Sequence, residues 1–214
     1  MATRNYKKNG PKNMIILLIV LLLALLGFQL PDSLITDLIS EKTVEKTETP
    51  TYNNPGPIDQ GNAAFTQEDL KTSASWIQYE PLDSLGRAVG ADALLDKARI
   101  GTGSSADPNI RPTGFISGKA PYYHSRGHLI ARVLGGSGSD PRNLCTLYQQ
   151  PVNSPYMTKY ETLIRDALER GDLVRYRVRV LYDGNDLLPA AITLEAKSVK
   201  MNLIDFNIKI ENKR

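Results

Sequence analysis

The chain reads Tyr-His-Ser-Arg-Gly-His-Leu-Ile-Ala from Tyr123 to Ala131. This stretch holds both histidines of the chain, so any chemistry that needs an imidazole takes place here. Histidine titrates near neutral pH and can accept a proton from water, whereas arginine stays charged and binds phosphate as a fork. Gly127, between Arg126 and His128, lets a backbone or a ligand come close. The motif is short, and taken alone it leaves a purely structural role open for either histidine.

A second polar group follows downstream, where Asn153 and Glu161 are eight residues apart. The residues from Ser154 to Arg170 predict a helix that ends at Gly171. At about 1.5 Å per residue, the two side chains start about 12 Å apart along the axis, on faces about 80° apart. They cannot easily share an ion directly, but Asn153 can bind the ion while Glu161 holds one of its waters. Mg²⁺ suits such a site because it keeps several waters.

The residues around these motifs predict a mixed α+β domain. A helix is expected over 83–98, where apolar residues recur at helical spacing after the capping pair Asp83-Ser84. Strands are expected over 122–133, 173–182, 189–197 and 203–210, and the second of these alternates arginines with apolar residues. Cys145 is the one cysteine, which excludes a disulfide within the chain and a zinc site built on several thiolates.

The N-terminal part of the chain differs in composition from this domain. Residues 1–13 are basic, and residues 14–30 form an uncharged, largely apolar run near the lower length limit for a membrane span. No small-residue cleavage motif follows the run, so we expect a transmembrane signal anchor rather than secretion after cleavage, which is the alternative. The basic flank places the rest of the chain outside the cell. Residues 31–62 predict a linker or stalk, and residues 63–214 the globular domain.

Taken together, these motifs resemble the DNA/RNA non-specific endonucleases of the ββα-metal fold, in particular the streptococcal-type secreted or membrane-bound DNases. The likeness covers most of the domain. Each motif alone has little specificity, but their order and spacing together are specific. The motifs are Tyr79–Ala88, Arg99, Pro112–Phe115, Ser125–Ile130, Arg142–Leu144, Asn153, Met157, Tyr160–Glu161 and Val174–Val178. The resemblance implies a central antiparallel sheet flanked by helices, here preceded by the N-terminal transmembrane helix.

The resemblance also implies roles for single residues. His128 matches the general base that activates the attacking water, and Asn153 matches the single direct ligand of Mg²⁺, for which Mn²⁺ is an alternative. Glu161 matches the acid that orients water on the metal, and Arg126 matches the arginine near the scissile phosphate. The best-known form of the motif has aspartate where this chain has Ser125, a change from which we expect tuning rather than loss of activity.

The charge distribution agrees with a polyanionic substrate. The whole chain carries only +3, but residues 111–179 hold 11 basic and 5 acidic side chains. We expect DNA, and also RNA, to be bound through phosphates without sequence specificity, with Arg126, Arg175 and Arg177 as contacts. A solvated strand face is an equal alternative for the last two.

The predicted activity is Mg²⁺-dependent hydrolysis of phosphodiester bonds. Two alternatives remain: a membrane-anchored DNA-binding receptor with a degenerate nuclease site, and an exported nuclease toxin, which an immunity or inhibitor protein would accompany.

Overall fold

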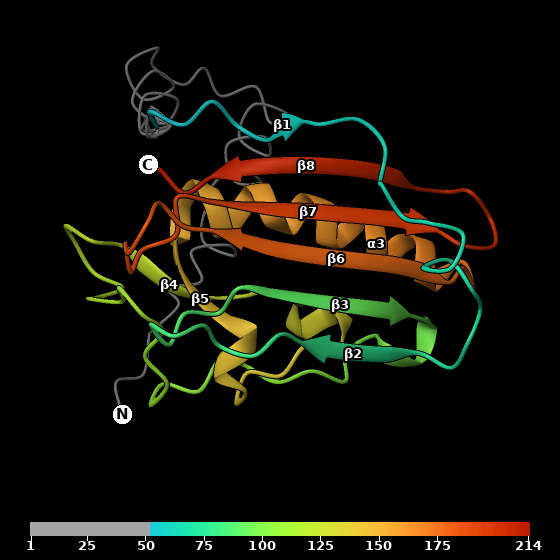
Figure 1. Cartoon of the computed structure of the whole chain (residues 1–214), viewed down its shortest axis with the longest axis horizontal. Helices are drawn as coiled ribbons and strands as arrows, with labels where there is room; N and C mark the ends of the chain where they lie inside the picture. Colours follow the sequence, from blue (N-terminus) through green and yellow to red (C-terminus); the bar gives the residue numbers. More distant parts are fainter. Residues whose placement is uncertain (1–51) are drawn as a thin grey trace, which may run out of the picture. The chain divides into compact units, whose positions relative to one another are not determined.

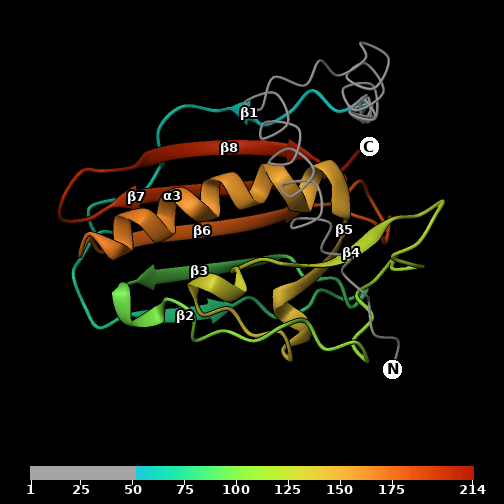
Figure 2. The same ribbon diagram turned by 180° about the vertical axis from the view of Figure 1, so that it is seen from behind.

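The computed structural model describes residues 52–214. They form a six-stranded antiparallel sheet in the order β1-β8-β7-β6-β3-β2, with one long helix, α3 (Thr158–Glu169), across one face (Figures 1 and 2). The strands are β1 (Ile58–Asp59), β2 (Trp76–Tyr79), β3 (Gly90–Leu95), β6 (Val174–Leu181), β7 (Ala191–Ser198) and β8 (Asp205–Glu211). A separate antiparallel pair contains β4 (His124–His128) and β5 (Leu144–Tyr148).

Strand β6 explains how the sequence builds the two faces of the sheet. Tyr176 and Val178 are fully buried and share one core with Ile164 and Leu168 of α3. Because successive side chains of a strand point to opposite faces, the arginines between them lie on the face away from the helix. The expected strand over 173–182 is therefore confirmed, as are the strands expected near 189–197 and 203–210.

Helix α3 is shorter than the predicted helix over 154–170. Its buried residues, Ile164, Ala167 and Leu168, recur at the spacing of one helical face, and Gly171 with a φ of 93° follows its end. The start is at Thr158 because Ser154 has an extended backbone, with φ −146° and ψ 128°. The preceding residues form wide, interrupted helical turns, η4 (Gln149–Met157).

The prediction of a helix over 83–98 was wrong, because this segment contains β3, which pairs with β2 and β6. Almost every residue of β3 is buried, so apolar residues occur on both of its faces and imitate helical spacing. The strand predicted over 122–133 is shorter than expected, since β4 ends at His128. The remaining turns are η1 (Lys97–Arg99), η2 (Arg132–Leu134) and η3 (Pro141–Asn143).

The predicted α+β architecture with a central antiparallel sheet is confirmed, and the chain order β4, β5, α3 gives the expected ββα unit. Strand β1 pairs with β8 although it lies within the segment expected to be a linker. The anchor predicted at residues 14–30 lies outside the described residues. Within residues 52–214, no helix is long and apolar enough to cross a membrane.

Candidate active site

An open polar pocket of about 140 Å³ lies where β4 ends and α3 begins. It brings together three residues that the sequence analysis selected, His128, Asn153 and Glu161, although they come from β4, η4 and α3. The other lining residues are Ala131, Arg132 and Thr158. The pocket therefore combines an imidazole, an amide, a carboxyl group and a guanidinium group.

Gly127 is required where it precedes His128 in β4. It pairs with Cys145 of β5, and a Cβ atom at this position would lie 2.5 Å from Cδ1 of the buried Leu147. A larger residue would displace the two strands of the hairpin from their packing against the core. The glycine of the Arg-Gly-His motif thus allows close packing at the strand that carries the imidazole.

The imidazole of His128 is fixed by one hydrogen bond. Its Nε2 lies 3.0 Å from the backbone carbonyl oxygen of Ser104, which can only accept. Nε2 therefore carries the hydrogen, and Nδ1 keeps a free lone pair. Burial, together with the positive charge of Arg132, lowers the pKa of His128 below 6.5, although the bond to Ser104 acts in the opposite direction. The ring is neutral at neutral pH, as a base must be.

The Ser104 carbonyl is itself held by contacts between two loops. The Ser104 amide donates to the Gly136 carbonyl at 3.1 Å, and the Gly138 amide donates to the Ser104 hydroxyl at 2.8 Å. A Cβ atom on Gly138 would lie 2.0 Å from the Ser105 carbonyl oxygen, so these backbones approach as closely as glycine allows. The position of His128 depends on this loop pair.

Asn143, from the Arg142–Leu144 motif, fixes the chain just after His128. Its buried side chain accepts from the Ile130 amide at 2.8 Å and donates to the carbonyls of Ile130 and Ser137, at 3.1 and 2.8 Å. These three bonds satisfy the amide group completely within the protein. Asn143 therefore stabilises the turn that leads to the pocket and is not one of its lining residues.

Asn153 and Glu161, which both carry side-chain oxygen atoms, line the same pocket. The Asn153 amide nitrogen donates to Gln149 at 3.3 Å, which leaves the carbonyl oxygen Oδ1 available. Burial raises the pKa of Glu161 to about 7. Because the backbone is extended at Ser154, the two residues do not belong to one continuous helix, and the axial separation expected from the sequence does not apply. Burial, and after it the nearby Glu161, raises the pKa of Tyr176, whose hydroxyl has no hydrogen-bond partner among the described residues.

The two arginines near His128 differ in their contacts. Arg126 donates to the carbonyls of Ile110 and Pro108, at 2.6 and 2.9 Å, and does not line the pocket. Arg132 is exposed, lines the pocket, and bonds only to the Ser105 hydroxyl among the described residues, at 2.9 Å. Arg132 is not among the site residues predicted from the sequence. The signal would have been a tight turn after β4 that brings the fourth residue after His128 back to the histidine.

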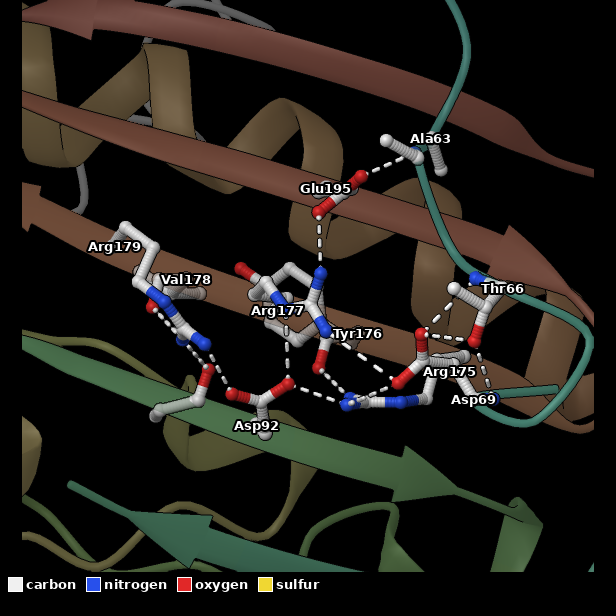
Figure 3. A network of polar contacts seen from close by, with 12 residues as sticks. Ala63, Thr66, Asp69, Asp92, Arg175, Tyr176, Arg177, Val178, Arg179 and Glu195 are labelled. Carbon is white, nitrogen blue, oxygen red and sulfur yellow. Dashed lines mark hydrogen bonds and ion pairs between the residues drawn. The ribbon is translucent and has the colours of Figure 1, made fainter.

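The arginines predicted to contact substrate on β6 lie away from this pocket. Arg177 Nε and Arg179 Nη2 lie 3.1 and 2.6 Å from the carboxylate oxygens of Asp92, and Arg175 also pairs with Asp92 (Figure 3). Arg177 additionally pairs with Glu195 at 3.3 Å. Burial alone would raise the pKa of Asp92, but the hydrogen bonds from Arg179 and Arg175 hold it below the ordinary value. The structure places this network on the sheet face opposite α3.

Comparison with known proteins agrees with the family resemblance that the sequence motifs indicate. Residues 68–200 match the family model described as DNA/RNA non-specific endonuclease. The chain is similar to NucA from Streptococcus agalactiae in a magnesium-bound structure, with 27% identity, a TM-score of 0.64, and coverage of 78% of this chain and 86% of that one.

Two further structures agree in fold. The metal-free NucA structure gives 28% identity and a TM-score of 0.61, over 74% of this chain and 80% of that one. Sda1 nuclease with bound zinc has 21% identity and a TM-score of 0.64, over 73% of this chain and 90% of that one. The chain therefore belongs to the DNA/RNA non-specific endonuclease family and is an endonuclease.

Proposed function

We propose that this protein hydrolyses phosphodiester bonds of DNA and RNA with a divalent cation, Mg²⁺ first, and with His128 as the general base. The observation that carries the proposal is the hydrogen bond from His128 Nε2 to the Ser104 carbonyl, which leaves Nδ1 unprotonated on a histidine that lines one pocket with Asn153 and Glu161. A DNA-binding receptor would not need a base in this protonation state.

The pocket residues fit a hydrated divalent ion. Asn153 offers an amide oxygen and Glu161 a carboxylate, and hard oxygen donors are what Mg²⁺ prefers. Residues 52–214 contain no cluster of three or more His, Cys, Asp or Glu side chains, so a closed cage of such side chains is absent from the described part of the chain. Asn153 would hold the ion directly and Glu161 would hold water beside it. NucA was solved with magnesium and Sda1 with zinc, which supports a divalent ion here.

A bound cation supplies positive charge that offsets the charge developing on the phosphate. The remaining steps belong to the protein. His128 Nδ1 accepts a proton from the attacking water, whose oxygen forms a bond to phosphorus as the bond to the leaving 3′ oxygen breaks. Arg132 binds a non-bridging phosphate oxygen, and we keep Arg126 as a second phosphate contact on the same hairpin. None of these groups reads a base, so cleavage is independent of sequence.

The experiment is cleavage of supercoiled plasmid and of a structured RNA by the purified full chain. Mg²⁺, Mn²⁺ and EDTA are compared at equal ionic strength, because phosphate binding depends on salt. We expect cleavage of both nucleic acids with Mg²⁺ or Mn²⁺ and none with EDTA. A folded protein that binds plasmid tightly with Mg²⁺ but does not cut it would favour the receptor, and Ser125→Asp would then be the first variant to test.

We further propose that residues 14–30 anchor the protein in the cell membrane with the endonuclease domain outside. The support is the uncharged run with a basic N-terminal flank in the sequence. Protease added to intact cells should release an active fragment from the membrane fraction. Full-length activity in the medium alone, with an N-terminus after residue 30, would instead indicate secretion after signal cleavage.

A further inference from the structure

The segment that leads into β4, together with Arg126 of β4 itself, carries a largely exposed cluster of aromatic and basic residues, of which only Arg126 has a proposed role in cleavage. We call it the aromatic–basic patch, and it contains Arg111, Phe115, Ile116, Lys119, Tyr122, Tyr123 and Arg126. The fractional exposures of Ile116, Tyr122 and Tyr123 are 51%, 40% and 38%. Three large apolar side chains exposed within eight residues indicate a binding surface rather than chance exposure.

The patch lies in a segment without negative charge. From Pro108 to Ser139 the chain has four arginines and lysines and no aspartate or glutamate. Guanidinium groups lie on the aromatic rings: those of Arg126 and Arg111 are 4.4 and 5.4 Å from the centre of the Phe115 ring. Arg214 lies 4.0 Å from the centre of the Tyr123 ring. Positive charge beside exposed rings is the pattern of surfaces that bind single-stranded nucleic acid.

The backbone holds Tyr123 in a conformation that glycine would adopt more easily. Its φ is 53°, in the left-handed region that bulky side chains rarely occupy. The conformation is fixed by its amide, which donates to the Lys119 carbonyl at 3.0 Å, and by its carbonyl, which accepts from Gln149 at 2.9 Å. Strain of this kind at an exposed aromatic residue points to a function of the ring.

The buried side chain of His124 packs beneath the patch and supports its aromatic rings. The His124 ring is 5.8 Å from the Tyr122 ring and 6.0 Å from the Phe115 ring, and its Nδ1 accepts from the Ile116 amide at 3.2 Å. The ring is 6% exposed and packs on Tyr148 of β5 from the other side. His124 is therefore a structural residue that presents the aromatic side chains. Rings held in place in this way lose little entropy when a base stacks on them.

We propose that the aromatic–basic patch stacks unpaired bases of a single-stranded segment whose scissile phosphate lies in the His128 pocket. The inference rests on the proposed nuclease function and names its preferred substrate form. Along β4, the backbone from His124 below the patch to His128 at the pocket covers four residue steps, about 13 Å, so one short segment of a strand can reach both. A duplex hides its base faces, so the patch discriminates for unpaired nucleic acid.

The test compares binding of three labelled probes to the full chain in EDTA: a single-stranded oligothymidylate, an abasic oligonucleotide of equal length and charge, and a duplex. The variant Tyr122→Ala/Tyr123→Gly removes both rings, and its glycine relieves the left-handed backbone strain at position 123. Tyr122→Phe/Tyr123→Phe keeps the rings, and Met201→Ala removes an equally exposed apolar side chain at 49% exposure elsewhere.

We expect the parent and the Phe variant to bind oligothymidylate roughly tenfold or more tightly than the abasic probe. The Ala/Gly variant should lose this preference, keep its duplex affinity, and still unfold in one cooperative thermal transition. If the Ala/Gly variant lost equal affinity for the thymidylate and abasic probes, or lost none for either, the proposal would be overturned.

The measurements distinguish failure of the stacking proposal from failure of the nuclease proposal. If the Ala/Gly variant cuts duplex plasmid at the parent rate and still shows the thymidylate preference, the stacking proposal fails while the nuclease stands. If the parent prefers thymidylate but never cuts with Mg²⁺, the nuclease proposal fails while the patch remains a single-strand binding surface.

Discussion

The Nε2 atom of His128 lies 3.0 Å from the backbone carbonyl oxygen of Ser104, and this contact sets the protonation pattern of the imidazole. The contact belongs to a segment remote from the histidine in the sequence, so loop packing rather than the Arg-Gly-His motif decides which nitrogen is the base.

Displacing the Ser104 loop should disable the site without changing a pocket residue. In Gly138→Ala the new methyl group meets the Ser105 carbonyl oxygen at 2.0 Å, so the loop pair must separate. We expect the variant to lose about 1–3 kcal/mol of unfolding free energy. Its kcat for plasmid should fall roughly tenfold or more, because the base is no longer oriented. Gly118→Ala, whose new contact is at 3.3 Å, is the control and should cut at the parent rate.

The pH dependence of the rate should report the lowered pKa of His128. Only the neutral imidazole accepts a proton, so at Mg²⁺ concentrations that saturate the site at every pH, kcat/KM should rise with pH through a midpoint below 6.5 and then level off. Arg132→Gln removes a positive charge that disfavours the imidazolium form, so the pKa of His128 rises and the midpoint moves to higher pH. Arg126→Gln serves as the comparison and should leave the midpoint in place. A midpoint unchanged or lowered in Arg132→Gln would contradict the electrostatic role.

Metal activation should depend on the protonation of Glu161. Burial raises the pKa of this carboxyl group to about 7, and a neutral carboxyl orients water on a cation poorly. The Mg²⁺ concentration needed for half-maximal cleavage should therefore increase as pH falls below about 7, because binding must release a proton. Glu161→Gln should remove that pH dependence and lower turnover. Asn153→Ala should raise the Mg²⁺ requirement at every pH, and a normal Mg²⁺ titration for this variant would exclude Asn153 as the ligand.

The arginine network on the outer sheet face should contribute mainly to stability. Asp92→Asn leaves three arginines without their shared carboxylate, and we expect a loss of about 3 kcal/mol in unfolding free energy. Because the folded-state pKa of Asp92 is depressed, its stabilisation is present above the unfolded pKa and is lost as pH falls through the folded value. Thermal melts across acidic pH test both points, with exposed Asp186→Asn as the control.

The same network tests the substrate role predicted for Arg175 and Arg177. If the arginines act only in the network, Arg177→Gln should lower the melting temperature and leave KM unchanged. A raised KM at an unchanged melting temperature would support direct contact with the nucleic acid.

A strand was predictable where its own sequence alternates between polar residues and buried apolar residues. The alternation of arginine with apolar residues in 174–181 marks a sheet with a buried face and a polar face, and β6 has this form. Strand β3 was not predictable in the same way, because a central strand with buried residues on both faces loses the alternation. Its apolar spacing also fits a helix, and only the pairing with β2 and β6 decides between them.

The residues of the candidate site were predictable from motifs, but their geometry was not. His128, Asn153 and Glu161 were selected from spacing and resemblance, and they line one pocket. The interruption at Ser154, which changes how Asn153 faces Glu161, has no signal in a helical pattern. The partners of His128 and Arg126 are backbone carbonyls of distant loops, and no side-chain motif can encode them.

Whether His128 acts as the base is measured by plasmid cleavage, with the full chain and His128→Ala compared at equal concentration with Mg²⁺. We expect the variant to cut roughly 10²–10⁴-fold more slowly while it binds the plasmid as tightly as the parent. Cleavage by His128→Ala at the parent rate would show that His128 is not the base.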